Sequence, residues 1–305
     1  MKFLSFVRQN EADRRLGVEL DSNRIFDVTA YRASLSASDA AHVPSSLDEL
    51  VAADEESTRV VFAVARDAAH ANYVIVASGI TYLPPLIPRK NVFCVGRNYR
   101  EHIIEGNIAN GRPANSFPEA IEFFTKPPTA LVGHDAPVLR HAGLTNSLDF
   151  EVELAIIIGK RGRDISEAEA MDYVFGFTIV NDITARDLQK KHGQWFKGKG
   201  LDTSCPIGPV VVHKSAISNP NALHLSLDVN GEERQSANTD EMIFSVQAVI
   251  AQLSAGMTLE PGDIISTGTP KGVGFAAIPP RCLNVGDVVA AHVDGIGTLR
   301  NTIVA

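Results

Sequence analysis

Three carboxylates stand at the ends of two apolar segments of the sequence. Glu151 and Glu153 flank one valine at the start of LDFEVELAIIIGK, and Asp182 ends YVFGFTIVND. Residues two apart in a β-strand point to the same face, so Glu151 and Glu153 would project together. Three oxygen ligands with no nearby His or Cys favour a hard cation, Mg²⁺, Mn²⁺ or Ca²⁺, over zinc. The alternative is that both glutamates lie on the solvated face of an edge strand.

A histidine and a glutamate follow the glycine of GRNYREHIIEG, residues 96–106. If this segment is helical, His102 and Glu105 lie about one turn apart on the same face. A carboxylate beside an imidazole fixes its tautomer and raises its basicity, so the pair could take a proton from water. A solvated helix that ends at Gly106 would show the same spacing.

Basic residues gather between positions 186 and 206 of a chain that is acidic overall. They suit an anionic substrate, although a solvated face explains Lys190 and Lys191 equally well. Lys199 stands between two glycines, which permit close approach of the backbone. The glycine-rich stretch STGTPKGVGF (266–275) lacks the pattern of a nucleotide-binding loop. Its main-chain amides and Thr269 could hold a small anion, and a plain tight turn is the alternative.

The segments that carry these residues are mostly strands. Apolar or alternating patterns predict strands at 92–96, 148–160, 173–182, 208–213 and 223–233, the last with a hairpin turn at Asn230-Gly231. Helices are predicted at 166–174 and 239–256. Strands and helices do not alternate regularly, which disfavours a Rossmann fold or a TIM barrel. We therefore expect a strand-rich α+β fold.

The first 85 residues are predicted to form a smaller α+β unit. Short alternating strands and one helix, SSLDELVAA, precede TYLPPLIPRKN, where three prolines prevent regular structure. We expect a small N-terminal domain over 1–85 and a catalytic domain over 86–305.

Composition and charge exclude several classes of function. The 305 residues carry a formal charge of −8, which argues against nucleic acid as the main partner. No apolar run approaches the ~18–20 residues that span a bilayer, and no secretory signal is evident. Three scattered cysteines argue against a disulfide scaffold. These features predict a cytoplasmic protein that binds neither membrane nor nucleic acid.

Taken together, the motifs resemble the fumarylacetoacetate hydrolase family over residues 91–304. The matching segments, in the expected order, are GRNYREHIIE, FTKPPTALVG, DFEVELAIIIG, NDITARDLQ, KGKGLDTSCPIGP, STGTPKGVG and GIGTLRN. The chain is most similar to the bacterial branch of acylpyruvate hydrolases and 2-hydroxyhepta-2,4-diene-1,7-dioate isomerases. The resemblance implies a mixed β-sandwich roll, a homodimer and a divalent metal, Mg²⁺ in the first place.

The resemblance also assigns roles to individual residues. It implies that Glu151, Glu153 and Asp182 bind the metal and that His102, Glu105 and Lys199 are catalytic. The substrate-binding positions that it implies are Arg97, Tyr99, Lys126, Arg186, Gln189 and Thr269.

The first function predicted is hydrolysis of the carbon–carbon bond in acylpyruvate-type 1,3-dicarbonyl acids. A metal chelated by the 2-oxo acid would stabilise the enolate that leaves, while His102, oriented by Glu105, activates water. The same groups could serve an isomerase or decarboxylase of a related 2-oxo diacid, namely a 2-hydroxyhepta-2,4-diene-1,7-dioate isomerase or an oxaloacetate decarboxylase, or a hydrolase of a diketo sugar acid. A non-catalytic metal-binding protein is the alternative of another class. Glycines and prolines after the helix predict a mobile lid over 102–119.

Overall fold

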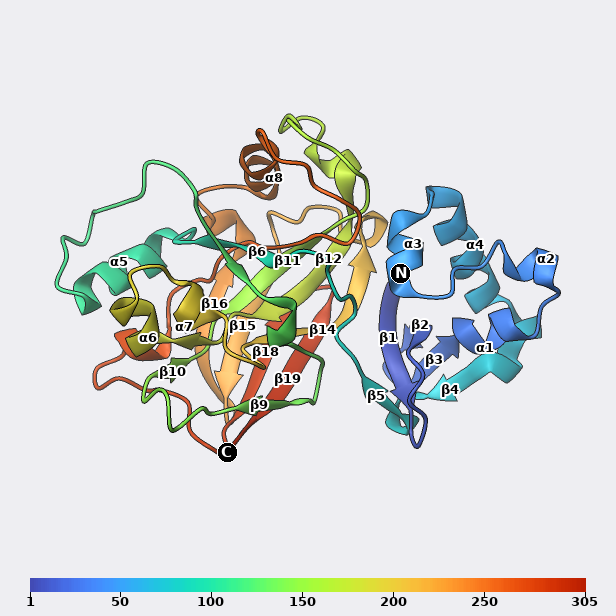
Figure 1. Cartoon of the computed structure of the whole chain (residues 1–305), viewed down its shortest axis with the longest axis horizontal. Helices are drawn as coiled ribbons and strands as arrows, with labels where there is room; N and C mark the ends of the chain where they lie inside the picture. Colours follow the sequence, from blue (N-terminus) through green and yellow to red (C-terminus); the bar gives the residue numbers. More distant parts are fainter.

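The computed structural model describes the main chain of residues 1–305 and the side chains of all residues except Ala68. The strands form one sheet of 12, one of 5 and one pair, which confirms the strand-rich α+β class. The five-stranded sheet faces the central strands of the large sheet, and Figure 1 shows the two layers of this mixed β-sandwich.

The large sheet runs through ten strands from β4 at one edge to β7 at the other. In hydrogen-bonded order these strands are β4 (Val74–Val76), β3 (Arg24–Asp27), β2 (Arg15–Asp21), β1 (Lys2–Arg8), β14 (Cys205–His213), β12 (Val174–Asn181), β11 (Val152–Ile158), β17 (Ile264–Ser266), β6 (Val92–Gly96) and β7 (Glu122–Lys126). Two short strands lie off this path: β5 (Ile80–Tyr82) pairs with β1, and β8 (Leu131–Val132) pairs with β14.

The remaining strands and the helices surround this sheet. The five-stranded sheet has the order β16 (Glu232–Asn238), β15 (His224–Val229), β18 (Val288–Val293), β19 (Gly297–Val304) and β9 (Pro137–Leu139), and β10 (Leu148–Asp149) pairs with β13 (Thr184–Ala185). The α-helices are α1 (Val28–Ala33), α2 (Ala37–Ala40), α3 (Leu47–Ala52), α4 (Glu55–Arg66), α5 (Arg100–Ala109), α6 (Arg186–Lys191), α7 (Phe196–Lys199) and α8 (Val246–Ser254).

Strand β11 is buried on both faces, and its alternation sets the direction of each side chain. Leu154 and Ile156 lie in the core that the two sheets share. Ala155 and Ile157 belong to a second core on the opposite face. Glu153 shares this second face, because residues two apart in a strand point the same way. The apolar half of LDFEVELAIIIGK thus anchors the strand and holds its acidic start in place.

The antiparallel pairing of β11 with β12 brings the third carboxylate close. Val152 pairs with Asn181, so the residue before β11 lies opposite the residue after β12. The Asp182 N–H donates to the main-chain oxygen of Glu151 over 2.8 Å. Strand register therefore brings Asp182 next to Glu151, although the two residues are far apart in the sequence.

The N-terminal part is joined to the rest by both sheet and core. β1 pairs antiparallel with β14, with Phe3 opposite Val211. Phe3 and Leu47 share the second core with Ile157 and Val211. In Figure 1 this part lies on one side of the molecule, with β1 next to the central strands. The division near residue 85 remains a prediction, because one sheet and one core cross it.

Two predicted helices differ from the structure. Residues 166–174 contain only a 3₁₀ turn at Ala170–Tyr173, with main-chain hydrogen bonds that run three residues back. The helix predicted over 239–256 begins at Val246, where the Ser245 side chain caps α8. Before it, Thr239–Glu241 form a separate 3₁₀ turn, and the Asn98 side-chain oxygen accepts the Phe244 N–H, so a tertiary contact interrupts the predicted helix.

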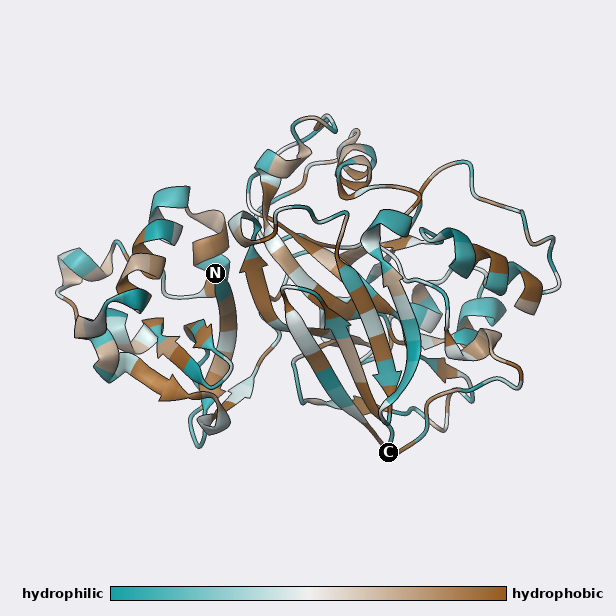
Figure 2. Ribbon diagram, turned by 180° about the vertical axis from the view of Figure 1, so that it is seen from behind, coloured by the Kyte–Doolittle hydropathy of each residue, from teal (hydrophilic) through white to brown (hydrophobic). Residues whose placement is uncertain are grey.

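Other expectations about local structure hold. The predicted hairpin at Asn230-Gly231 is confirmed, with φ angles of 56° and 77° at a turn that joins β15 to β16. Figure 2 shows the hydrophobic residues concentrated on the strands of the central sheets. Among the described helices, none has the length and apolar character required to cross a membrane.

Candidate active site

A cavity of about 540 Å³ opens beside the ends of β11 and β12. This volume falls in the range of small-molecule sites. Glu151, Glu153 and Lys199 line it from the sheet and from α7, and His102 and Arg186 line it from α5 and α6. With Arg97, Gln189 and Thr269, the cavity brings together eight of the site residues predicted from the sequence.

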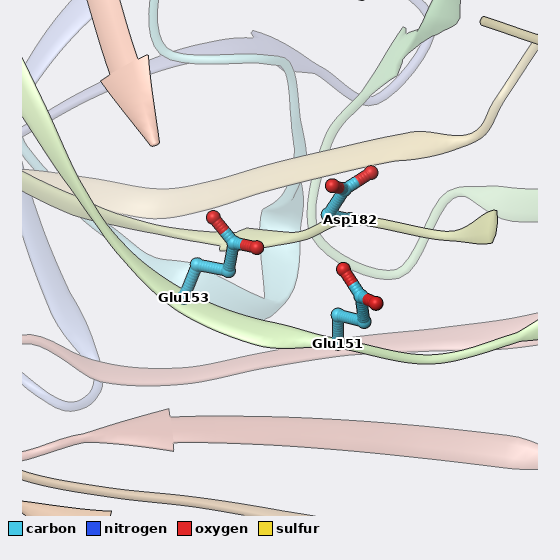
Figure 3. A group of neighbouring side chains, drawn as sticks. All are labelled: Glu151, Glu153 and Asp182. Carbon is cyan, nitrogen blue, oxygen red and sulfur yellow. The ribbon is translucent and has the colours of Figure 1, made fainter. Parts of the chain in front are cut away.

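The three predicted metal-binding carboxylates are gathered in one place. Glu151, Glu153 and Asp182 each offer an oxygen within 4.8 Å of the others, and all three are buried. Figure 3 shows the three carboxylates turned toward a common space, with both glutamates on β11 or its start. All-oxygen ligands of this kind suit a hard divalent cation.

The three carboxylates differ in whether a cationic side chain forms an ion pair with them. Burial and the charges of Asp182 and Glu151 raise the pKa of Glu153 to about 8. Ser266 Oγ and the Gly268 N–H donate to Glu153 Oε2 over 2.5 and 2.8 Å. No cationic side chain among those described forms an ion pair with Glu153. A divalent cation would neutralise this excess negative charge, so the donor set fits a metal.

Two lysines hold the other members of the acidic group. Lys199 Nζ donates to Glu151 Oε2 and Asp182 Oδ2, each over 2.7 Å. Burial opposes the charge of Glu151, but Lys199 and Arg186 outweigh burial and hold its pKa well below the usual range. Lys126 Nζ donates to Asp182 Oδ1 over 2.6 Å and to two main-chain oxygens. Lys126 is fully buried behind Asp182, so the structure does not bring it to the cavity wall where substrate contact was expected.

The histidine and glutamate of α5 form the expected pair. His102 Nδ1 lies 3.0 Å from Glu105 Oε1. The Gly272 N–H donates to both Glu105 oxygens over 3.0 and 2.9 Å. Gly272 has a φ of +103°, and a Cβ there would lie 2.0 Å from the main-chain oxygen of Arg234. Only glycine allows this loop to hold Glu105 from outside the helix.

Three of the predicted substrate-binding residues line the cavity close to the acidic group. Arg186 Nη2 donates to Glu151 Oε1 over 2.6 Å, and Nη1 donates to Gln189 Oε1 over 3.3 Å. Thr269 Oγ1 accepts a hydrogen bond from Gln235 Nε2 over 2.8 Å. These contacts fix the three side chains at the cavity wall.

Arg97 and Tyr99 occupy different environments. Arg97 lines the cavity and donates to Glu122 and to the main-chain oxygen of Ser116. Tyr99 is 1% exposed and lies in the main core, and its hydroxyl has no hydrogen-bond partner among the described atoms. Burial raises the pKa of Tyr99. The structure therefore brings Arg97, but not Tyr99, to the cavity.

Two buried polar residues that support the site were not predicted from the sequence. Asp149 accepts hydrogen bonds from Arg186 and from three main-chain amides. Gln235 joins the Val152 N–H to Thr269. Asp149 could have been found, because Asp149, Glu151 and Glu153 continue one alternating acidic pattern. Gln235 has no such signal, since only the packing of the two sheets brings it near β11.

Several known proteins match this chain over nearly its whole length. The family described as "Fumarylacetoacetate (FAA) hydrolase C-terminal" matches residues 91–304. "Oxaloacetate tautomerase YisK" of Bacillus subtilis is 45% identical over 295 residues, 94% of this chain and 95% of that protein. "Oxaloacetate tautomerase fahd2, mitochondrial" of Xenopus laevis is 37% identical over 100% of this chain and 90% of that protein. The solved fumarylacetoacetate hydrolase of Exiguobacterium antarcticum is 38% identical, with a TM-score of 0.80 over 100% of this chain and 99% of that one.

Proposed function

Because this chain belongs to the fumarylacetoacetate hydrolase family, we propose that it is a divalent-metal-dependent enzyme that interconverts the keto and enol forms of a small 2-oxo diacid. Oxaloacetate is the first candidate substrate, since two similar proteins carry the name oxaloacetate tautomerase. The observation that carries the proposal is the buried group Glu151, Glu153 and Asp182 at a cavity that also holds His102 and Arg186.

A divalent cation held by the three carboxylates would act as a Lewis acid on the 2-oxo acid. The other steps belong to side chains of the protein. Glu105 accepts the hydrogen of His102 Nδ1, which leaves Nε2 as a base for a proton on the carbon beside the carbonyl. Lys199 has two of its three N–H groups on carboxylates, and the third can give a proton to the carbonyl oxygen. His102 then releases its proton to solvent and Lys199 takes one up, which restores both groups. The net change is one proton moved from carbon to oxygen.

A diacid also suits the charges at the cavity. Arg186 presents a guanidinium that can bind one carboxylate in two contacts. Arg112 and Lys190 line the same cavity, and no described carboxylate forms an ion pair with either one. These two cations are available for a second carboxylate of the substrate.

Hydrolysis of acylpyruvates, ranked first from the sequence, becomes the second candidate. Both reactions create negative charge on the same 2-oxo acid, but hydrolysis also needs a water placed against a second carbonyl. The similarity to a solved structure named a fumarylacetoacetate hydrolase supports this alternative. The names of the curated relatives favour tautomerisation over it.

The test follows the ultraviolet band of enolic oxaloacetate with purified protein and Mg²⁺ or Mn²⁺. We expect the protein to accelerate decay of this band toward the keto–enol equilibrium while total oxaloacetate stays constant and no pyruvate forms. Excess chelator should abolish the acceleration. If pyruvate appears in step with the decay, the reaction is decarboxylation. If oxaloacetate is untouched and an acylpyruvate is cleaved, hydrolysis replaces the proposal.

A further inference from the structure

Asp149 is a buried carboxylate between two parts of the site. It ends β10, two residues before Glu151, and is fully shielded from solvent. Its Oδ2 accepts from Arg186 Nε over 2.9 Å and from the Phe275 N–H over 3.1 Å. Its Oδ1 accepts from the Gly274 N–H over 2.7 Å and the Phe150 N–H over 3.0 Å. One side chain thus fixes the arginine and the glycine-rich loop together.

The glycine-rich loop also holds the α5 pair. The Gly272 N–H donates to Glu105, and two residues later the Gly274 N–H donates to Asp149. A Cβ at Gly274 would lie 2.6 Å from Asp149 Oδ1 and 2.3 Å from the main-chain oxygen of Arg281. Glycine at this position is required for the loop to approach the carboxylate so closely.

Phe275 makes a second link between the same elements. Its ring centre lies 4.4 Å from the Arg186 guanidinium carbon, in the geometry of a cation–π contact. The far edge of the ring faces Gly106 of α5, where a Cβ would lie 3.8 Å away. The ring therefore lies against Arg186 with its tip next to α5.

We propose that Asp149, acting with the loop 272–276, is a positioning residue that aims Arg186 at a substrate carboxylate and sets its distance from the His102–Glu105 pair. Arg186 Nε is fully used by Asp149, and Nη2 donates to Glu151, so rotation of the guanidinium is blocked at two corners. Nη1 also donates to Gln189, which leaves one N–H on each terminal nitrogen for a ligand in the cavity that Arg186 lines. This inference rests on the proposed function, in which Arg186 binds a 2-oxo diacid.

The test is a double-mutant cycle of Asp149→Asn and Arg186→Lys. Asparagine keeps the size of the side chain, but only one of its two terminal atoms accepts hydrogen bonds, so Arg186 Nε and the loop amides cannot both be satisfied. We expect Asp149→Asn to raise KM for oxaloacetate about tenfold, with a smaller change in kcat. In the Arg186→Lys background, the same change should alter KM by less than about twofold, because the arginine it positions is absent. If the KM of the double variant changes by the product of the two single-variant changes, the two residues act independently and the inference is overturned.

A second readout does not depend on turnover. Trp195 is the only tryptophan of the chain and lines the cavity, so its fluorescence can report binding of oxalate in the presence of Mg²⁺. Asp149→Asn should weaken oxalate binding in the wild-type background and leave it unchanged beside Arg186→Lys. Phe275→Leu, which keeps the main-chain amides on Asp149, should weaken binding less than Asp149→Asn.

Matched controls separate positioning from folding and from failure of the proposed function. Asp172→Asn, at an exposed site, should leave KM, oxalate binding and the melting temperature unchanged. A lower melting temperature for Asp149→Asn with unaltered KM and oxalate affinity would show a structural role and overturn the inference. If the wild type turns over oxaloacetate but the cycle is additive, only this inference fails. If it neither binds oxalate nor acts on a 2-oxo acid, the proposed function fails first and the role of Arg186 with it.

Discussion

Of the three carboxylates Glu151, Glu153 and Asp182, Glu153 is the one with no ion pair to a described cation. Its oxygens accept from Ser266 and the Gly268 N–H, but no ion pair with a described cation offsets its buried charge. Without a cationic partner the buried carboxyl resists ionisation, which destabilises the folded chain at neutral pH relative to the unfolded chain, and a bound divalent cation would reverse that effect. The same side chain is thus expected to cost stability without metal and to be essential for metal binding.

Glu153→Gln should therefore separate stability from metal binding. In chelator at neutral pH, we expect the melting temperature to stay the same or rise. Glutamine keeps both hydrogen-bond acceptor contacts, and it removes a carboxyl group whose pKa folding raises to about 8, which favours the unfolded chain above the ordinary pKa of glutamate. Added Mg²⁺ should stabilise the wild type, by about 2.7 kcal/mol at 100 times Kd, but not the variant. Thermal melts with chelator and with a Mg²⁺ series measure both effects. Glu167→Gln, at an exposed position, is the control; a variant at 153 that still responds to Mg²⁺ like the wild type would contradict the ligand assignment.

His102 and Glu105 should differ in how much activity depends on them. His102→Gln removes the proposed base and should lower kcat about 10²–10⁴-fold with little change in KM. Glu105→Gln still offers an oxygen to His102 and should lower kcat less, by about 10–100-fold. Steady-state kinetics on enolic oxaloacetate measure both values. Equal activity of His102→Gln and wild type would remove the pair from the mechanism.

At the scale of elements, α5 and the loop that follows it form the segment predicted to be a lid. Asn107 Nδ2 donates to the main-chain oxygens of Ala114 and Ser116, and Arg97 also donates to Ser116. In Figure 1 the loop after α5 arches outward at the edge of the molecule. The middle of the loop is thus tied to α5 by Asn107 and to the end of β6 by Arg97.

We expect ligand binding to protect this segment from hydrogen exchange. With Mg²⁺ and oxalate, amides of residues 102–119 should exchange more slowly than without them, because closure reduces local opening. The buried strand β12 serves as the internal control, since its exchange should not depend on the ligand. Equal protection of 102–119 in both states would argue against a lid.

At the scale of the whole molecule, the shared sheet and core predict one cooperative unit. Removing residues 1–85 would expose the edge of β14 and the apolar face around Val211. We therefore expect a single unfolding transition in scanning calorimetry, with calorimetric and van't Hoff enthalpies that agree. Two separate transitions would show that the first 85 residues fold independently, as predicted from the sequence.

The homodimer expected from the family resemblance is also a prediction at this scale. One chain has a mass of 32.8 kDa. Sedimentation equilibrium should give twice this mass over a micromolar concentration range. A species of one chain's mass at all concentrations would contradict the expectation.

The sequence alone was sufficient for features that depend on local periodicity. Alternation in LDFEVELAIIIGK predicted that Glu151 and Glu153 share a face, and the structure places them so. The Asn230-Gly231 turn was predicted because few residue pairs adopt positive φ at two successive positions. The helix over 239–256 was predicted too long, because contacts of Asn98 with residues 243 and 244 are invisible in the local sequence.

Tertiary structure decided which polar groups lie close together and which of them are already hydrogen-bonded within the protein. The sequence determined a strand-rich chain with an acidic pair and a histidine–glutamate pair, since strand and helix periods act over a few residues. Only the fold placed Lys126 behind Asp182 and Asp149 against Arg186. The physical reason is that a buried charge must find its partners in space, and strand register and loop closure, not sequence distance, determine which partners are near.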